Sequence, residues 1–252
     1  MLIKNGNLFT VTKGILMETD LRISEGKISE IGKALTTNDG ELTIDGQGKW
    51  VFPGFIDAHC HIGMWEEGMG FEGADGNETT DPITPHLRAI DAINPLDEAF
   101  ANALKGGVTC AASGPGSANV IGGTFAVIKL AGNRIDDMIV KNPIAMKCAF
   151  GENPKRVYAD KKTTPSTRMG TAALLRDTLA KAVEYNKKKI AAIDDPSKAP
   201  NYDMKMEAML PVVRGEMPLK AHAHRADDII TSIRIDRKST RLNSSHGING
   251  FV

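Results

Sequence analysis

Residues 2–50 alternate between short apolar runs and turn residues, a pattern typical of β-strands. The candidate strands lie within residues 2–6, 20–32 and 42–48. The Glu25-Gly26 step, placed between Ile23 and Ile28, predicts a hairpin turn. We therefore expect residues 1–52 to form a small β-sandwich segment at the amino terminus.

From residue 51 the pattern changes to strands that alternate with amphipathic helices, as in βα units around a parallel sheet. It predicts strands near residues 51–61, 107–113, 137–141, 144–150 and 217–224, and helices near residues 95–106, 166–190 and 204–214. The glycine-rich run 113–124 is interpreted as a substrate-facing loop that leads from the second strand into a helix. It matches neither a P-loop nor a dinucleotide fingerprint, so a nucleotide cofactor is not expected.

The composition narrows the class of protein. The 252 residues are 41% hydrophobic and 25% charged, which is ordinary for a globular chain. Lys plus Arg and Asp plus Glu both number 31, so no basic surplus attracts nucleic acid or an anionic membrane. No run approaches the ~18 apolar residues of a membrane span. We expect a cytoplasmic protein with a small-molecule substrate, no nucleic-acid partner and no membrane partner. The three cysteines are expected to be buried free thiols.

The chemistry of the chain centres on His59-Cys60-His61, which closes an apolar, strand-like run. Alternate side chains of a strand share a face, so His59 and His61 project together while Cys60 points away into packing. Two imidazoles on one rigid strand end can bind a catalytic divalent ion that keeps a position open for water. A bare pair of this kind also arises by chance on half-buried strands, but the Pro53-Gly54 turn and Asp57 favour a site.

At this motif the chain resembles the amidohydrolase superfamily of metal-dependent hydrolases, and within it the imidazolonepropionase-like branch. The first barrel strand of that family carries the signature PGxIDxHxH, and Pro53 to His61 match it at every defined position. The resemblance covers about residues 1–235. It implies an α/β fold, a (β/α)8 TIM-type barrel, whose amino-terminal β-sandwich segment is completed by strands from the far carboxyl terminus.

The resemblance also implies where further metal ligands lie, because barrel sites gather at the carboxyl ends of strands. Glu152 follows the strand at 144–150, and His222 ends the strand at 217–224. We therefore expect His59, His61, Glu152 and His222 to bind a divalent metal, most simply zinc. Some relatives use a carbamylated lysine instead, for which Lys147 is the candidate. Since Lys147 lies five residues earlier in the strand, Glu152 is the preferred ligand.

Residues expected to contact the substrate surround these ligands. They are His224, one step beyond His222 on the same face, Asn119 in the glycine-rich run, and Arg156 and Tyr158 after the fourth strand. The acidic loop from Trp65 to Asn94 follows the first metal-binding strand and has the length of a lid or binding loop. His86 has no supporting pattern and is not assigned a role.

Together with these residues, the resemblance implies a metal-dependent hydrolase of carbon–nitrogen bonds, other than typical peptide bonds, in cyclic amides or dipeptide-like small substrates. Deamination is disfavoured, because the glutamate that related deaminases place three residues after the histidine is replaced by Arg225 or Asp227. The alternatives are a non-catalytic metal- or ligand-binding remnant, and a carbon–oxygen or phosphoester hydrolase on the same barrel.

The length of the chain limits how much of the barrel it can form. A (β/α)8 barrel needs about 250 residues, so residues 53–235 hold only its first βα units and the predicted fold is an incomplete barrel. The catalytic aspartate of the eighth strand is absent, no catalytic residue is assigned, and we expect this fragment to be inactive. A homo-oligomer of the full-length form is left open.

Residues 236–252 are polar and without pattern. Reverse translation of residues 236–246 reproduces a widely used sequencing adapter in one frame. We expect residues 236–252 to be non-native, and the alternative is a flexible charged tail.

Overall fold

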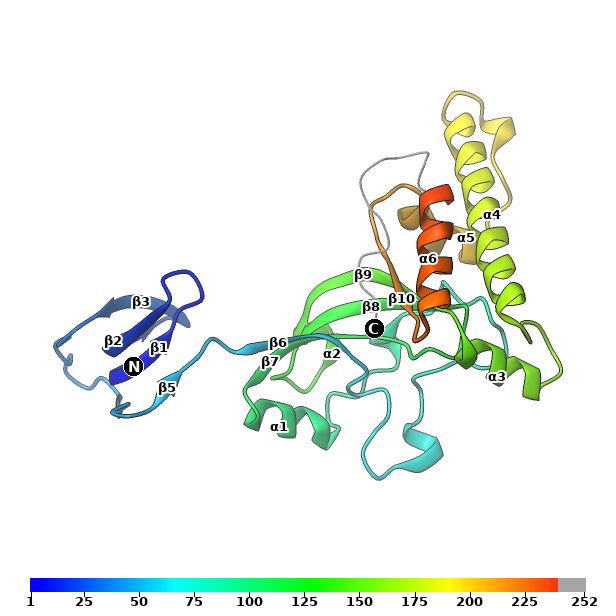
Figure 1. The fold of residues 1–252 in the computed structure, drawn as a ribbon. Helices are drawn as coiled ribbons and strands as arrows, with labels where there is room; N and C mark the ends of the chain where they lie inside the picture. The colour runs from blue at the N-terminus through cyan, green and yellow to red at the C-terminus, as the bar shows by residue number, and fades with distance from the viewer. Residues whose placement is uncertain (240–252) are drawn as a thin grey trace. The chain divides into compact units, whose positions relative to one another are not determined.

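The computed structural model describes residues 1–239, with side chains as far as Asp236. It contains two compact units, residues 1–55 and the part of the chain from Ile56 on (Figure 1). The last helix continues to Ser239, so it includes the first residues of the predicted non-native tail. The rest of that tail, residues 240–252, lies outside the described residues.

The amino-terminal unit is a single five-stranded sheet. Its strands are β1 (Leu2–Phe9), β2 (Ile15–Ser24), β3 (Lys27–Gly32), β4 (Thr43–Asp45) and β5 (Trp50–Val51). The order is β3-β2-β1-β4, and β5 also pairs with β1. The predicted hairpin is confirmed, since Ser24 pairs with Lys27. Glu25 and Gly26 have φ of 51° and 72°, as a tight hairpin turn requires. The second layer of a sandwich stays a prediction.

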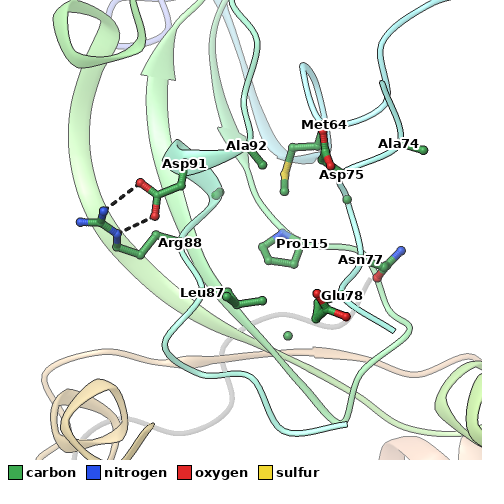
Figure 2. A pocket seen from close by; sticks show the side chains of 13 residues that line it. Met64, Ala74, Asp75, Asn77, Glu78, Leu87, Arg88, Asp91, Ala92 and Pro115 are labelled. Carbon is green, nitrogen blue, oxygen red and sulfur yellow. Dashed lines mark hydrogen bonds and ion pairs between the residues drawn. The ribbon is translucent and has the colours of Figure 1, made fainter. Parts of the chain in front are cut away.

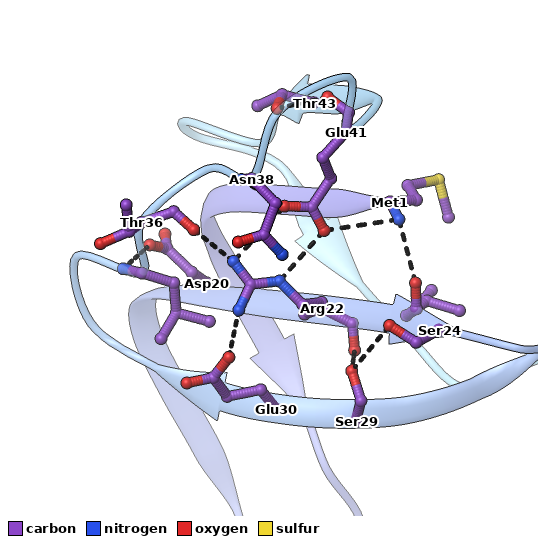
Figure 3. A network of polar contacts seen from close by, with 12 residues as sticks. Met1, Asp20, Arg22, Ser24, Ser29, Glu30, Thr36, Asn38, Glu41 and Thr43 are labelled. Carbon is purple, nitrogen blue, oxygen red and sulfur yellow. Dashed lines mark hydrogen bonds and ion pairs between the residues drawn. The ribbon is translucent and has the colours of Figure 1, made fainter.

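A polar network ties this sheet to the segment that follows β3 (Figure 3). The Arg22 guanidinium pairs with Glu30 and Glu41 and donates to the Thr36 carbonyl. Glu41 also lies 3.6 Å from the amino-terminal ammonium of Met1. The Arg22 and Glu41 side chains are only 14% and 8% exposed, so the charges are held mainly by one another and not by water.

The second unit is built on another five-stranded sheet. It contains β6 (Phe55–Cys60), β7 (Val108–Ser113), β8 (Ile121–Lys129), β9 (Ile139–Ala149) and β10 (Leu219–His222), in the order β10-β9-β8-β7-β6. β10 runs parallel to β9, as βα units require. β8 runs antiparallel to both of its neighbours. The sheet is therefore mixed, and closure into an eight-stranded barrel stays a prediction.

The expectation that the glycine-rich run leads into a helix was wrong, because the last residues of the run begin strand β8. Gly122 and Gly123 lower strand propensity, which is why the sequence pattern indicates a loop there. Gly123 is required by the strand itself. It has φ of 118° at an irregularity in the pairing with β9, and a Cβ there would lie 2.5 Å from the Leu87 carbonyl oxygen.

The two strands predicted at 137–141 and 144–150 are one strand, β9. The break was expected because Pro143 cannot donate a ladder hydrogen bond. The strand accommodates this proline with a shift in register. Phe125 pairs with Ala145 and Val127 pairs with Lys141, so the residues around Pro143 bulge out of the ladder.

Helices flank the sheet (Figure 1). They are α1 (Glu98–Lys105), α2 (Ile135–Met138), α3 (Glu152–Asp160), α4 (Arg168–Asp194), α5 (Met204–Val213) and α6 (Ala226–Ser239), with short 3-10 turns η1 (Gly70–Gly73), η2 (Ala89–Asp91) and η3 (Pro196–Lys198). The largest apolar core joins β9 and β10 to α4, α5 and α6, and contains Met146, Cys148, Leu175, Met209 and Leu219. None of the helices within residues 1–239 is long and apolar enough to span a bilayer.

The sheet of the second unit curls strongly. β6 and β10 are its two edge strands. Even so, Lys220 Nζ on β10 donates a hydrogen bond of 2.5 Å to the Ala58 carbonyl on β6. One lysine side chain therefore spans the concave side of the sheet. Side chains that point to this inner face from all five strands must lie close together.

The pKa of Glu41 provides a test of the amino-terminal network. It is lowered from 4.5, first by the Asn38 backbone N–H and then by the Arg22 guanidinium. A lowered folded-state pKa adds stability that is present above pH 4.5 and is lost as the pH falls through the folded value. Glu41→Gln should increase amide hydrogen exchange in β1 and β2 at pH 7, and the difference from the parent protein should shrink below pH 4.5. Glu18→Gln, a change at an exposed glutamate of β2, should have no such effect. A pH-independent difference for Glu41→Gln would contradict this account.

Candidate metal centre

The inner face of the curled sheet holds the histidines of the first motif. His59 is the last residue but one of β6 and His61 directly follows the strand, with ring centroids 5.1 Å apart. Cys60 between them packs into the apolar cluster on the other side. His61 Nδ1 lies 2.6 Å from the Gly114 carbonyl oxygen, so this nitrogen carries the proton and Nε2 keeps its lone pair. That tautomer suits a metal ligand.

Burial keeps these imidazoles neutral. Desolvation, together with the smaller effect of the neighbouring Lys147 and Lys220 charges, lowers the pKa of His59 to about 3. Desolvation also lowers the pKa of His61 and brings the pKa of His222 to about 4. The neutral ring is the form that donates a nitrogen lone pair to a metal.

Lys147 lies near the carboxyl end of β9. It is fully buried, and its ammonium nitrogen has no hydrogen-bond partner among the described residues. Desolvation lowers its pKa to about 8. The charge of Lys147 lowers the pKa of His59, His61 and His222. Its Nζ lies 5.9 Å from the centroid of the Phe125 ring, which stacks on His59.

An aromatic ring from β8 forms the floor of this cluster. Phe125 is fully buried and stacks on His59, with centroids 5.2 Å apart and planes at 23°. Its ring face also lies 4.7 Å from Lys220 Nζ and 5.9 Å from Lys147 Nζ. Gly114 permits this packing, since a Cβ there would lie 2.1 Å from the Phe125 ring. The two lysines thus face a π-system in place of water.

His222 and His224 lie at the end of β10, with ring centroids 4.3 Å apart. His222 is 9% exposed, and its Nε2 accepts a hydrogen bond of 3.1 Å from the Asn153 side-chain amide. His224 is more open, with 57% of its side chain exposed. Its Nδ1 lies 2.6 Å from Glu152 Oε1.

Glu152 is committed to cations outside the cluster. Besides His224, it contacts Arg168 Nη2 at 3.3 Å. Its own backbone N–H and the His224 hydrogen bond lower its pKa, so it is ionised at neutral pH. Glu152 therefore orients His224 in this structure. Lys147 is the residue that lies with the other predicted ligands.

The residues of the inner face fit a divalent ion in donor chemistry. His59 Nδ1 and Lys147 Nζ are both buried polar atoms without partners among the described residues. As the side chains stand, however, no three His, Cys, Asp or Glu residues within the described chain are close enough to hold one ion. Lys147 could add a donor only after modification, because an unmodified ammonium has no lone pair to give.

Comparison with known proteins identifies the fold family. No protein-family model matches the chain. A crystal structure of an amidohydrolase from Thermotoga maritima matches it with a TM-score of 0.88 and 47% identity, covering 94% of this chain. The chain is an amidohydrolase-superfamily member. The amidohydrolase tasK of Hapsidospora irregularis is 30% identical over 236 residues, and a dihydroorotase of Trichlorobacter lovleyi is 44% identical over 62.

The chain spans only part of these amidohydrolase relatives. It covers 62% of the Thermotoga chain, 24% of tasK and 15% of the dihydroorotase. The predicted superfamily is confirmed.

Two of the residues predicted to contact substrate lie inside this amidohydrolase fold. Asn119 and Tyr158 are 2% and 1% exposed. The Tyr158 hydroxyl donates to Asn119 Oδ1 at 2.6 Å, and Asn119 Nδ2 donates to Thr84 Oγ1 at 2.8 Å. Burial raises the pKa of Tyr158. These polar groups are used within the protein, where they fasten α3 to the loop before β8. Arg156 lies exposed on α3.

The long acidic loop after β6 folds over the neighbouring strands and encloses a pocket of about 230 Å³ (Figure 2). Asp75, Glu78 and Asp91 line it, and Asp91 is paired with Arg88 at 2.8 Å. Trp65 links the loop to the metal-centre residues, because its ring meets that of His61 edge-on at 5.3 Å. The loop therefore shapes the surroundings of the first motif.

Sequence reasoning missed three residues of the site. Lys220 could have been found, since it lies two residues before His222 and so shares its face. Phe125 gave no signal because β8 was not predicted. Asn153 gave none because it faces His222 only through the turn between β9 and α3.

The buried hydroxyl of Tyr158 makes a testable prediction about its role. Tyr158→Phe leaves Asn119 Oδ1 buried without a donor, which should cost about 1–3 kcal/mol of unfolding free energy. Chemical denaturation followed by circular dichroism measures this. Tyr202→Phe, at a residue 76% exposed, serves as the matched control and should change nothing. Unchanged stability in Tyr158→Phe would free the hydroxyl for the predicted substrate contact.

Proposed function

We propose that the full-length protein is a metal-dependent hydrolase of carbon–nitrogen bonds in cyclic amides or dipeptide-like small molecules. The observation that carries the proposal is the meeting of His59, His61, His222 and Lys147 on the inner face of one curled sheet. The relatives support the same class, since they include proteins named dihydroorotase and D-hydantoinase. Because the chain covers only a fraction of those proteins, we propose the activity for the full-length protein.

In this proposal the metal ligands are His59, His61 and His222 with Lys147 as a carbamate, which replaces the assignment of Glu152. A buried amine with a pKa of about 8 is partly neutral near pH 7. The neutral amine can add to carbon dioxide, forming an N–C bond and releasing one proton, and the product is a carboxylate. The carbamate would remove the buried ammonium charge of Lys147, which has no partner among the described residues, and would provide oxygen donors to the metal beside the histidine nitrogens.

A bound divalent ion, with zinc as the simplest choice, would supply a water of lowered pKa and would polarise the scissile carbonyl. The protein's own residues prepare the place for this chemistry. The Gly114 carbonyl holds the His61 tautomer, and Phe125 excludes water from one side of His59. Glu152 orients His224 so that its Nε2 faces outward from the pair, ready to accept or donate a hydrogen bond to a substrate.

Metal content tests the ligand assignment. Zinc or cobalt affinity is measured by chelator competition on the purified protein after incubation with bicarbonate. Loss of a residue that only supports a metal ligand weakens metal binding by roughly 10–100-fold. His61→Ala and Lys147→Met each remove a proposed ligand, so they should weaken metal binding by more than this. Glu152→Gln should retain the metal, since Glu152 holds His224 and Arg168. His86→Ala is the control for removal of a histidine without an assigned role.

The outcomes separate the alternatives. Metal loss in Glu152→Gln with retention in Lys147→Met would restore the glutamate as the ligand. Absence of metal binding by the parent protein would refute the metal centre. Tight metal binding without turnover of hydantoins, dihydropyrimidines or dipeptides would favour a non-catalytic binding protein. Turnover of esters or phosphoesters alone would favour a carbon–oxygen or phosphoester hydrolase.

A further inference from the structure

A second cavity, of about 280 Å³, lies between α4 and α6. These two helices pack side by side (Figure 1). Three arginines line the cavity, Arg168 and Arg176 from α4 and Arg234 from α6. Arg168, Ala172 and Arg176 recur at intervals of four, so they share one face of α4. On α6, Asp227, Thr231 and Arg234 share a face in the same way.

The acidic side chains of this cavity neutralise only one of its three arginines, Arg168. Asp228 is 3% exposed and binds Arg168 Nε at 2.9 Å. Asp227 binds Arg225, which lies outside the cavity, at 2.9 Å. Within the described residues, the side chains of Arg176 and Arg234, which are both exposed, make no hydrogen bond or ion pair. Two guanidinium groups from different helices therefore line one cavity without a counter-ion among residues 1–236.

We propose that the cavity between α4 and α6 binds a phosphate group. Guanidinium forks bind oxyanions through paired, charge-assisted hydrogen bonds. Arginines that approach from two helices suit a tetrahedral anion, whose oxygens point in several directions, better than a planar carboxylate. Phe150, Met169 and Ala172 add an apolar side to the lining, which suits the organic part of a phosphate ester.

The cavity is separate from the metal centre but is connected to it by side-chain contacts. Arg168 lines the cavity and also contacts Glu152, and Glu152 holds His224. Gly151 allows the close approach of Asp228 that fixes Arg168, because a Cβ at this residue, with φ of 78°, would lie 2.6 Å from Asp228 Oδ2. The cavity thus lies behind the turn that carries Glu152. Phosphate binding there does not require a metal.

Isothermal titration calorimetry on metal-free protein at constant ionic strength tests the proposal. Inorganic phosphate and glycerol phosphate are titrated separately, with acetate as the planar comparison. The parent protein should bind phosphate saturably. Tighter binding of glycerol phosphate would identify an esterified ligand, and equal or tighter binding of inorganic phosphate would identify the free anion.

Variants place the binding in this cavity. Arg176→Gln combined with Arg234→Gln should weaken phosphate binding by about tenfold or more, since each removes a charged donor. Lys33→Gln combined with Lys188→Gln removes the same charge at exposed residues outside the cavity and should leave binding unchanged. His61→Ala should also bind phosphate normally.

Four results would overturn the proposal. They are absence of saturable phosphate binding by the parent protein, unchanged binding by the double arginine variant, equal binding of acetate, and loss of binding in His61→Ala, which would move the anion to the metal centre. None of them bears on zinc affinity, so the proposed hydrolase would be judged separately.

Discussion

Five basic side chains share the concave face of one sheet, and the cost of charging them there constrains everything that the face can do. They are His59, His61, Lys147, Lys220 and His222. The pKa of each is lowered, with desolvation as the first cause and, for the histidines, repulsion from the lysines as a further one. The group is tolerable only if most members are uncharged or if an anion or metal joins them. Neutral imidazoles and a partly neutral amine are electron-pair donors, so the constraint that opposes charge also favours ligation.

The contrast between Lys147 and Glu152 follows from the same constraint. Ligands gather at strand ends in barrels, and by that rule Glu152 is the better candidate. The rule does not account for what else is nearby. Arg168 and His224 compete for the Glu152 carboxylate and hold it at the entrance to α3. Lys147, deeper in β9, has no hydrogen-bond or ion-pair partner among the described residues that would hold it away from a metal. Depth in the strand matters less here than the absence of another partner.

Sequence patterns predicted the parts of this molecule that depend on local chemistry. The hairpin at Glu25-Gly26, the shared face of His59 and His61, and the helix that begins near Met204 follow from turn preference, strand alternation and helical periodicity. Residues whose role depends on partners distant in sequence were harder to predict. Tyr158 was assigned to substrate, but it bonds to Asn119, 39 residues away, inside the protein. No local pattern distinguishes a tyrosine that faces a ligand from one that faces the core.

β8 shows how one misjudged segment hides a site. Gly122 and Gly123 made the first residues of β8 resemble a loop, although Gly123 is needed where the strand passes Leu87. Once β8 is a strand, its alternation places Phe125 on the concave face, opposite the outward-packed Ala126. The ring then closes one side of His59 and lies against both lysines. Phe125 therefore covers one side of His59, while Trp65, from the loop after β6, borders His61. The antiparallel strand, an addition to the parallel βα pattern, thus supplies the ring that packs against both the histidine and the lysines.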